Sequence, residues 1–393
     1  MNLVISQRVK HIKPSPTLAV TARAAELKAA GKDIIGLGAG EPDFDTPDHI
    51  KAAAIDAINR GFTKYTAVDG TPELKSAIIK KFARDNSLNY DADQILVSCG
   101  GKHSFYNLCQ ALLNPDDEVI IPAPYWVSYP PMVELAQGKP VIVQGSMEND
   151  FKITAEQLSD SITDKTRMFI LNSPSNPTGA VYTTKELLVI AKVLKQHPDV
   201  LVVTDDIYEA IVLEGKPYQN ILTAAPELYA QTLVLNGVSK AYSMTGWRIG
   251  YAAGPAPLIK AMKTIQSQST SNPTSISQVA AQIGLEGDQS FIQTMLKAFK
   301  ERHEFVHQRL DEINSIDCKP AHGAFYLFPC VKEAIKQKGL KDDVELGEWL
   351  LENAGIAMVP GSAFGTPGFM RLSFATSMDN LTSAMDRLEK ALG

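Results

Sequence analysis

Short apolar runs alternate with longer segments of helical period from about residue 47 to residue 290, and this rhythm constrains the fold more than any other feature. The runs are apolar at consecutive positions, which is typical of strands buried on both faces of a sheet. Because helical segments separate them, the sequence predicts an α/β fold with a parallel sheet. The predicted strands are ILVS (95–98), EVIIP (118–122), MFILN (168–172), VLVVTD (200–205) and TLVLN (232–236), and the predicted helices include 102–113, 184–196 and 255–268.

The pattern changes after residue 290 and suits a smaller α+β lobe. The proline-rich segment at the start of the chain is expected to pack on that lobe. We therefore predict a large domain from residues 47–290 and a small domain built from residues 1–46 and 291–393. The segments of the small lobe are a long amphipathic helix (291–313), strand-like runs at 323–328, 356–359 and 369–374, a helix near 345–353 and a closing helix.

Composition narrows the class of partner. The 393 residues carry 38 Lys and Arg against 44 Asp and Glu, for a formal net charge of −6. A mildly acidic surface repels nucleic acid and anionic membranes, so small molecules are the expected partners. We predict no transmembrane helix and no signal peptide, because the chain lacks a stretch of about 18 apolar residues and its first residues lack an apolar core. We expect a cytoplasmic protein without a metal site.

Glycine and polar residues follow four of the predicted strands. Ligands of open parallel sheets bind at the carboxyl ends of the strands, so these residues are expected to converge on one edge. Each set alone has an ordinary reading as a turn, a helix cap or a solvated charge. Together they would supply a phosphate cradle, an amide, a carboxylate, a phenol and an amine. The four sets are CGGK (99–102), SPSNPTG (173–179), DDIY (205–208) and GVSK (237–240).

The residue types at this edge indicate a particular chemistry. A glycine pair that opens a helix leaves backbone N–H groups free to hold a phosphate. An amine that forms imines must be partly neutral near pH 7, which burial and nearby cations achieve, and Lys240 with Arg248 eight residues later fits that need. An acid placed against a pyridine nitrogen keeps the nitrogen protonated, so the ring can accept electrons. Asp205, at a buried strand end, is the candidate for that acid.

The chain resembles the class I aminotransferases of fold type I over nearly its whole length. It is most similar to the aspartate aminotransferase subgroup typical of bacteria, which includes the aspartate/prephenate aminotransferases. The ordered set of motifs that carries the resemblance is specific, and its lysine signature surrounds Lys240. The motifs are AGEPDFDTP (39–47), KYT (64–66), GGK (100–102), PYWVSY (124–129), NPTG (176–179), D-x-x-Y (205–208), SKAYSMTGWRIG (239–250) and MRLS (370–373).

The resemblance implies a pyridoxal 5'-phosphate cofactor and assigns residues to it. Lys240 would form the internal aldimine and shuttle the proton between substrate and cofactor, and Asp205 would pair with the pyridinium nitrogen. Tyr65 would reach the phosphate from a second subunit, which implies a homodimer with shared active sites. The remaining residues implied are Trp126 stacked on the ring, Tyr208 and Asn176 at the ring oxygen, and Gly101, Lys102, Ser239 and Arg248 at the phosphate.

The resemblance also implies the substrates. Arg371 would clamp the α-carboxylate, with Gly40, Asn176 and Trp126 beside it. In FMRLSF (369–374), alternation puts Arg371 on the face opposite Met370, Leu372 and Phe374, so periodicity alone would favour an arginine that faces solvent. No arginine occurs between Arg248 and Arg302, so Lys102 is the candidate for a distal carboxylate. The implied reaction transfers the amino group of L-aspartate to 2-oxoglutarate, and Thr17 in KPSPT (13–17) matches relatives that accept prephenate. Aromatic, alanine and branched-chain specificities remain open.

Three rival interpretations start from other residues. His303 and His307 satisfy H-E-x-x-H, the helical zinc motif of hydrolases, although Leu310 stands where the longer metzincin pattern has glycine. The glycines of GLGAG (36–40) suggest a dehydrogenase, but their spacing is not G-x-G-x-x-G and Pro42 interrupts the helix that should follow. A binding protein that lost catalysis is the third, and such a scaffold would have no need of Lys240 and Asp205.

Overall fold

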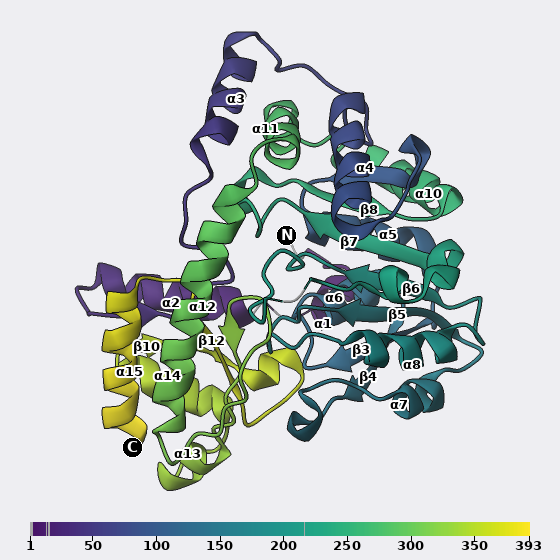
Figure 1. Ribbon diagram of the computed structural model, residues 1–393. Helices are drawn as coiled ribbons and strands as arrows, with labels where there is room; N and C mark the ends of the chain where they lie inside the picture. Colours follow the sequence, from purple (N-terminus) through teal and green to yellow (C-terminus); the bar gives the residue numbers. More distant parts are fainter. Residues whose placement is uncertain (1–2, 13, 15, 216) are drawn as a thin grey trace.

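The computed structural model describes residues 3–12, 14, 16–215 and 217–393. A seven-stranded sheet forms its centre, in the order β2-β8-β7-β6-β5-β3-β4 (Figure 1). All neighbours pair in parallel except β8, which is antiparallel to both β2 and β7. The strands are β2 (Ile95–Ser98), β3 (Glu118–Ala123), β4 (Lys139–Gln144), β5 (Thr166–Asn172), β6 (Leu201–Asp205), β7 (Thr232–Gly237) and β8 (Gly250–Ala253).

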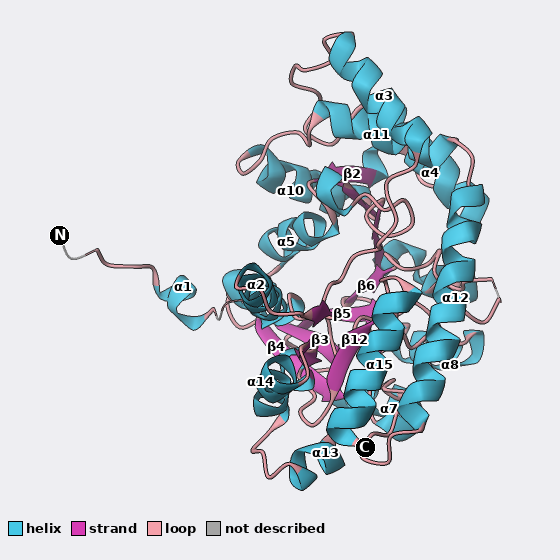
Figure 2. Ribbon diagram, turned by 90° about the vertical axis from the view of Figure 1, so that its left-hand side faces the viewer, coloured by secondary structure: helices cyan, strands magenta, loops and turns pink. Residues whose placement is uncertain are grey.

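Both faces of this sheet are buried, as the consecutive apolar runs predict. In β2, Ile95 and Val97 belong to one apolar core and Leu96 to another on the opposite face. Figure 2 shows the helices that cover the two faces, with α5 and α10 on one side and α4, α7 and α8 on the other. These helices are α4 (Pro72–Asn86), α5 (Gly101–Leu112), α7 (Ala155–Ser161), α8 (Thr184–Leu194) and α10 (Ala256–Ser267).

The C-terminal third of the chain has its own apolar core. This core gathers side chains from two long helices and three short strands, and it includes Ile35 and Leu37 from the N-terminal segment. β1 pairs in parallel with β10, so the two ends of the chain share a small sheet, and β11, β12 and β9 form another. The elements are β1 (Ile35–Gly36), α12 (Ser290–Asp311), β9 (Tyr326–Leu327), α13 (Lys332–Gln337), α14 (Asp343–Asn353), β10 (Ile356–Ala357), β11 (Val359–Pro360), β12 (Met370–Ser373) and α15 (Met378–Leu392). The predicted domain boundaries at residues 46/47 and 290/291 stay predictions.

The N-terminal segment begins outside the body of the molecule. The residues before the short helix α1 project away from the other elements (Figure 2), whereas α1 itself lies against α6. Several apolar side chains on this segment are exposed, among them Val4 at 91% and Leu3 at 71%. Within the described residues, no helix is both long and apolar enough to cross a membrane. The remaining helices are α1 (Gln7–His11), α2 (Pro16–Ala29), α3 (Asp48–Asn59), α6 (Tyr129–Leu135), α9 (Ile221–Ala224) and α11 (Ser275–Glu286).

Candidate active site

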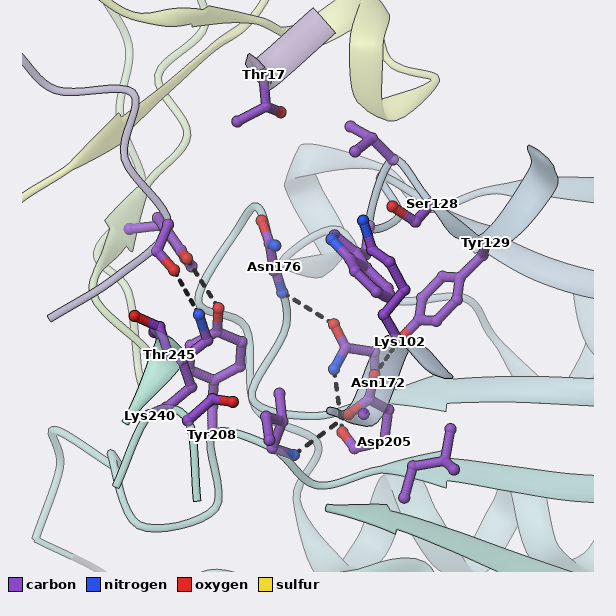
Figure 3. Close-up of a pocket in the computed structure, with 18 of the residues that line it drawn as sticks. Thr17, Lys102, Ser128, Tyr129, Asn172, Asn176, Asp205, Tyr208, Lys240 and Thr245 are labelled. Carbon is purple, nitrogen blue, oxygen red and sulfur yellow. Dashed lines mark hydrogen bonds between the residues drawn. The ribbon is translucent and has the colours of Figure 1, made fainter. Parts of the chain in front are cut away.

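A cavity of about 260 Å³ lies at the carboxyl ends of β5, β6 and β7, where the topology of the sheet predicts a ligand. Its lining residues come from the large sheet and its loops, from the C-terminal core and from the N-terminal segment (Figure 3). Every predicted site residue except Tyr65 lines it. Those residues are Thr17, Gly40, Gly101, Lys102, Trp126, Asn176, Asp205, Tyr208, Ser239, Lys240, Arg248 and Arg371.

Asp205, the last residue of β6, presents a buried carboxylate to the cavity. The Tyr129 hydroxyl donates to its Oδ2 at 2.5 Å, and the Ile207 N–H donates to its Oδ1 at 3.3 Å. Burial raises the pKa of Asp205, and these hydrogen bonds together with Lys240 oppose the rise. Asn172 Nδ2 donates to the Asp205 carbonyl oxygen at 3.0 Å, which fixes the backbone (Figure 3). The result is an oriented carboxylate able to accept from a cationic N–H.

Lys240 follows the end of β7 and places its amine in the same cavity. Its Nζ donates to the Gly40 carbonyl oxygen. Burial lowers the pKa of Lys240 to about 8, and the positive charge of Arg371 contributes to the decrease. A substantial fraction of this amine is therefore neutral slightly above neutral pH, as a nucleophile toward carbonyl groups requires.

The start of α5 forms a cradle for an anion. Gly100 has φ +92°, and a Cβ there would lie 2.1 Å from Nη2 of Arg248. A Cβ on Gly250 would lie 2.2 Å from the Gly101 nitrogen, so both glycines are needed for the close approach. No side chain caps the helix, and the N–H groups of Gly101 and Lys102 have no acceptor in the described part of the chain. Free N–H groups at a helix N-terminus beside an arginine are suited to a phosphate.

Arg371 is buried, with only 2% of its surface exposed. Its Nη1 donates to Asn176 Oδ1 at 2.8 Å and its Nη2 to the Gly38 carbonyl oxygen at 2.7 Å, while its Nε has no partner among the described residues. The guanidinium lies 4.5 Å from the ring centroid of Tyr326. Its contacts are thus neutral acceptors and aromatic rings, with no carboxylate among them. A buried cation without an anionic partner is costly, so this arrangement is suited to an anionic ligand.

Four aromatic residues frame the cavity. Trp126 packs edge-to-face against Tyr129, with ring centroids 5.2 Å apart, and the Lys102 amine lies 5.2 Å from the Trp126 ring. Burial and the nearby Arg248 lower the pKa of Lys102. The Tyr208 hydroxyl lies 2.8 Å from the Tyr326 hydroxyl. A flat ring bound between these groups would meet both an aromatic face and a hydroxyl.

Two predicted residues lie at or beyond the rim. Thr17 stands above the other labelled residues in Figure 3, and its hydroxyl has no hydrogen-bond partner among the described residues. Lys13 and Ser15, which share its motif, lie outside the described residues. Tyr65 does not line the cavity, and 91% of its surface is exposed. The prediction for Tyr65 requires a second subunit, so it stays a prediction.

Several residues that line the cavity are absent from the sequence prediction, among them Tyr129, Asn172 and Tyr326. Tyr129 bonds to Asp205, Asn172 holds the backbone of Asp205, and Tyr326 contacts Tyr208 and Arg371. The sequence did contain a signal for Asn172, because a polar residue at the end of a predicted strand indicates a place in the ligand site. Tyr326 had none, because it sits in an apolar run of the small lobe.

The structure gives the rival motifs other roles. His303 Nε2 accepts from the Ala321 N–H at 2.9 Å, and His307 Nε2 lies 3.0 Å from the Cys318 carbonyl oxygen. These contacts hold the turn before β9 and engage the nitrogens that zinc would need; burial lowers the pKa of His303 to about 4. In the dehydrogenase interpretation, a helix should follow Gly40. The described residues remain non-helical until α3 begins at Asp48, so that interpretation is wrong.

Comparison with known proteins agrees with this geometry. Residues 32–388 match the family described as aminotransferase class I and II. The aspartate/prephenate aminotransferase of Nitrosomonas europaea is 59% identical over 99% of both chains, and the aspartate aminotransferase of Geobacillus stearothermophilus is 52% identical over 98% of both. The crystal structure of the Rhizobium meliloti aspartate aminotransferase superposes with a TM-score of 0.96 at 47% identity, covering 100% of this chain and 99% of that one. The Thermus thermophilus enzyme with maleate gives 0.94 at 41% identity and covers both chains fully. The chain therefore belongs to the class I and II aminotransferases and is an aminotransferase of fold type I.

Proposed function

We propose that the enzyme uses pyridoxal 5'-phosphate to transfer the amino group of L-aspartate to 2-oxoglutarate, with prephenate as a second acceptor. The observation that carries the proposal is the set of charges in one cavity. Arg371 and Lys102 are cations without a carboxylate partner among the described residues, and they share that cavity with the amine of Lys240 and the acid of Asp205. A dicarboxylic substrate would supply the two missing negative charges.

The residues present fit the cofactor. The cradle formed by Gly101, Lys102, Ser239 and Arg248 suits its phosphate, and Asp205 suits its ring nitrogen. Trp126 offers a face to the ring, and Tyr208 and Asn176 offer donors for the ring oxygen. Asn176 can serve there because its Oδ1 is engaged by Arg371, which leaves its amide N–H₂ as donor. When bound, the cofactor supplies an electron-accepting ring next to the α-carbon of the substrate.

The chain's own residues would divide the remaining work. Lys240 Nζ would hold the cofactor and, when its amine is free, would move a proton to and from the substrate α-carbon. Asp205 keeps a proton on the ring nitrogen. Arg371 grips the α-carboxylate through its planar fork, with the Gly40 backbone alongside. Lys102 Nζ meets the distal carboxylate, and the unpartnered hydroxyl of Thr17 lies on the same side for a bulkier acid such as prephenate.

The experiment is a panel of amino donors assayed with 2-oxoglutarate, followed by a panel of oxo acids that includes prephenate. We expect kcat/KM to be highest for aspartate and glutamate among the donors, and prephenate to be accepted. A preference for alanine, leucine or phenylalanine over aspartate would contradict the dicarboxylate proposal while leaving the aminotransferase assignment intact.

We also propose a homodimer with shared active sites and the two-domain division at residues 46/47 and 290/291. Exposed apolar and aromatic groups on the N-terminal segment and around α3 support the dimer, including Tyr65 and Ile55 at 91% and 58% exposure. The separate C-terminal core supports the division. Light scattering should give twice the mass of the chain, and mixing Lys240→Ala with Tyr65→Phe subunits should yield more activity than either variant alone.

A further inference from the structure

The Tyr208 and Tyr326 hydroxyls form an isolated pair at the wall of the cavity. They lie 2.8 Å apart, and both side chains are buried, with exposures of 3% and 0%. Neither hydroxyl has another hydrogen-bond partner among the described residues. Burial raises the pKa of both phenols, well above its usual value for Tyr208, so both groups keep their protons at neutral pH.

In such a pair, one hydroxyl proton has no acceptor within the pair. Two hydroxyls carry two protons, but a single hydrogen bond between them uses only one. The other proton must point to an acceptor outside the pair. Both tyrosines line the cavity, so the free proton is directed at whatever occupies it. Which tyrosine delivers the proton depends on which one donates within the pair.

Either hydroxyl could donate within the pair, and the surroundings favour Tyr326 as the donor. The Arg371 guanidinium lies 4.5 Å from the Tyr326 ring centroid, whereas the nearest cation to the Tyr208 ring, Lys240 Nζ, is 5.8 Å away. A cation over an aromatic face withdraws electron density, and a phenol depleted in this way donates more strongly. The Tyr326 hydroxyl also lies beside the Gly40 backbone, where an added Cβ would come within 3.1 Å of the oxygen.

We propose that Tyr326 is a positioning residue, whose hydroxyl donates to Tyr208 and so directs the Tyr208 proton at the ring oxygen of the cofactor. The inference rests on the proposed cofactor. Arg371 would then influence that oxygen through two sets of contacts. One is its hydrogen bond to Asn176, and the other is its contact with the Tyr326 ring, followed by the hydrogen bond between the Tyr326 and Tyr208 hydroxyls. Hydrogen bonds in a chain polarise one another, so Tyr326 makes Tyr208 the stronger donor.

The consequence is a measurable pKa. A donor to the ring oxygen stabilises the negative charge that remains there when the neighbouring nitrogen contributed by Lys240 loses its proton. A weaker donor therefore raises the pKa of that nitrogen. Removing the Tyr326 hydroxyl should raise it by about half to one pH unit, the size expected for weakening one hydrogen bond.

The test is Tyr326→Phe, which keeps the ring under Arg371 and deletes only the hydroxyl. Tyr90→Phe is the matched control, because Tyr90 is also a buried tyrosine and its hydroxyl has no partner among the described residues. Thermal unfolding establishes that both variants fold. In holoenzyme, the visible absorbance is titrated with pH; we expect the upward shift in Tyr326→Phe and none in Tyr90→Phe.

Two further measurements separate this role from a structural one. Cofactor-free Tyr326→Phe should bind pyridoxal phosphate about threefold to tenfold more weakly than wild type, yet bind 3-deoxypyridoxal phosphate, which lacks the ring oxygen, equally well. In a Tyr208→Phe background, Tyr326→Phe should add no further shift. An unchanged titration, an equal loss for the deoxy analogue, or a full shift without Tyr208 would each overturn the inference. Wild-type protein that binds no pyridoxal phosphate would instead overturn the proposed function beneath it.

Discussion

The two ends of the cavity differ in how far their charged groups are satisfied by the protein itself. At the Asp205 end, the carboxylate accepts from Tyr129 and from a backbone N–H, and its own carbonyl oxygen is held by Asn172. At the opposite end, and counting only the residues that the structure describes, Arg371 has neutral acceptors and an unpartnered Nε, and the Lys102 amine lies over the Trp126 ring without a carboxylate partner. The protein itself supplies partners for the charged group at the Asp205 end, whereas the cations at the other end lack a counterion among the described residues.

This difference indicates that the Asp205 end binds a cofactor that stays in place and that the cationic end binds substrates that enter and leave. A cofactor that stays bound is best held by groups whose positions are fixed in advance. Substrates that enter and leave must compensate charges themselves, so the residues that select them carry charge without an internal counterion. Changes at the Asp205 end should therefore alter the chemical step, and changes at the cationic end should alter substrate binding.

The largest loss of turnover is expected from a change at Lys240, which shares the cavity with both groups. In the proposed mechanism Lys240 holds the cofactor and carries the proton, so turnover of Lys240→Ala should fall by about 10⁴-fold. The phosphate cradle is untouched, so the variant should still bind pyridoxal phosphate noncovalently. Single-turnover assays with aspartate measure the first effect and equilibrium dialysis the second. Transamination within tenfold of wild type would remove Lys240 from the mechanism.

Asp205→Ala tests the satisfied end. It removes the charge that keeps the ring nitrogen protonated, so kcat should fall by a factor of about one hundred or more, with a smaller loss of cofactor affinity. Asp206→Asn is the control, because the Asp206 carboxylate faces Thr204, Tyr218 and Asn220 and does not line the cavity. That control should lower the melting temperature and leave kcat of the folded fraction near wild type. Equal losses of kcat in both variants would contradict a specific role for the Asp205 carboxylate.

Lys102→Ala tests the unsatisfied end. The missing cation should raise KM for aspartate and 2-oxoglutarate about tenfold, the size of a charge-assisted contact of about 1.4 kcal/mol, and change KM for monocarboxylic amino acids much less. Lys10→Ala, on the exposed α1 helix, provides a control for loss of positive charge. If both substrate classes lost equally, Lys102 would not be the distal anchor.

The smallest effect concerns the pH dependence of cofactor binding. Only the neutral amine attacks a carbonyl group, and burial lowers the pKa of Lys240 to about 8. The association rate of pyridoxal phosphate with cofactor-free enzyme should therefore rise with pH below about 8 and level off above it. In Arg371→Met, the loss of the neighbouring positive charge should move the midpoint to higher pH. Stopped-flow absorbance would measure both, and a rate still rising linearly to pH 10 would show an ordinary lysine.

The sequence predicted the buried strands well and the irregular ones poorly. β3, β5, β6 and β7 lie within a residue or two of their predicted bounds, because a strand covered on both faces must be apolar throughout. β8 was missed because GYAA is small-residue rich, and the structure shows why: Gly250 must let the Gly101 nitrogen approach. β4 was missed because it is an edge strand with a mixed composition and partly exposed side chains.

The predicted strand at 323–328 shortened to β9 for a tertiary reason. Ala324 adopts φ +56°, and its N–H donates to the Ile211 carbonyl oxygen in the loop after β6. The run at 356–359 likewise divides, since Ile356–Ala357 pairs with β1 and Val359–Pro360 pairs with β12. Apolar content alone carries no information about which partner a short strand finds.

The sequence by itself determined the α/β sheet, the edge where ligands bind and twelve of the residues that line the cavity. The sheet and its edge follow from local patterns, since polar residues such as Asp205 directly end buried strands, whereas most of the site residues followed from the resemblance to the aminotransferases. Only the tertiary structure decided which charges have partners. Arg371 meets Gly38 and Asn176 across 333 and 195 residues of chain, and Tyr208 meets Tyr326 across 118. The burial of a cation and the pairing of two hydroxyls depend on packing between distant segments, which local patterns do not encode.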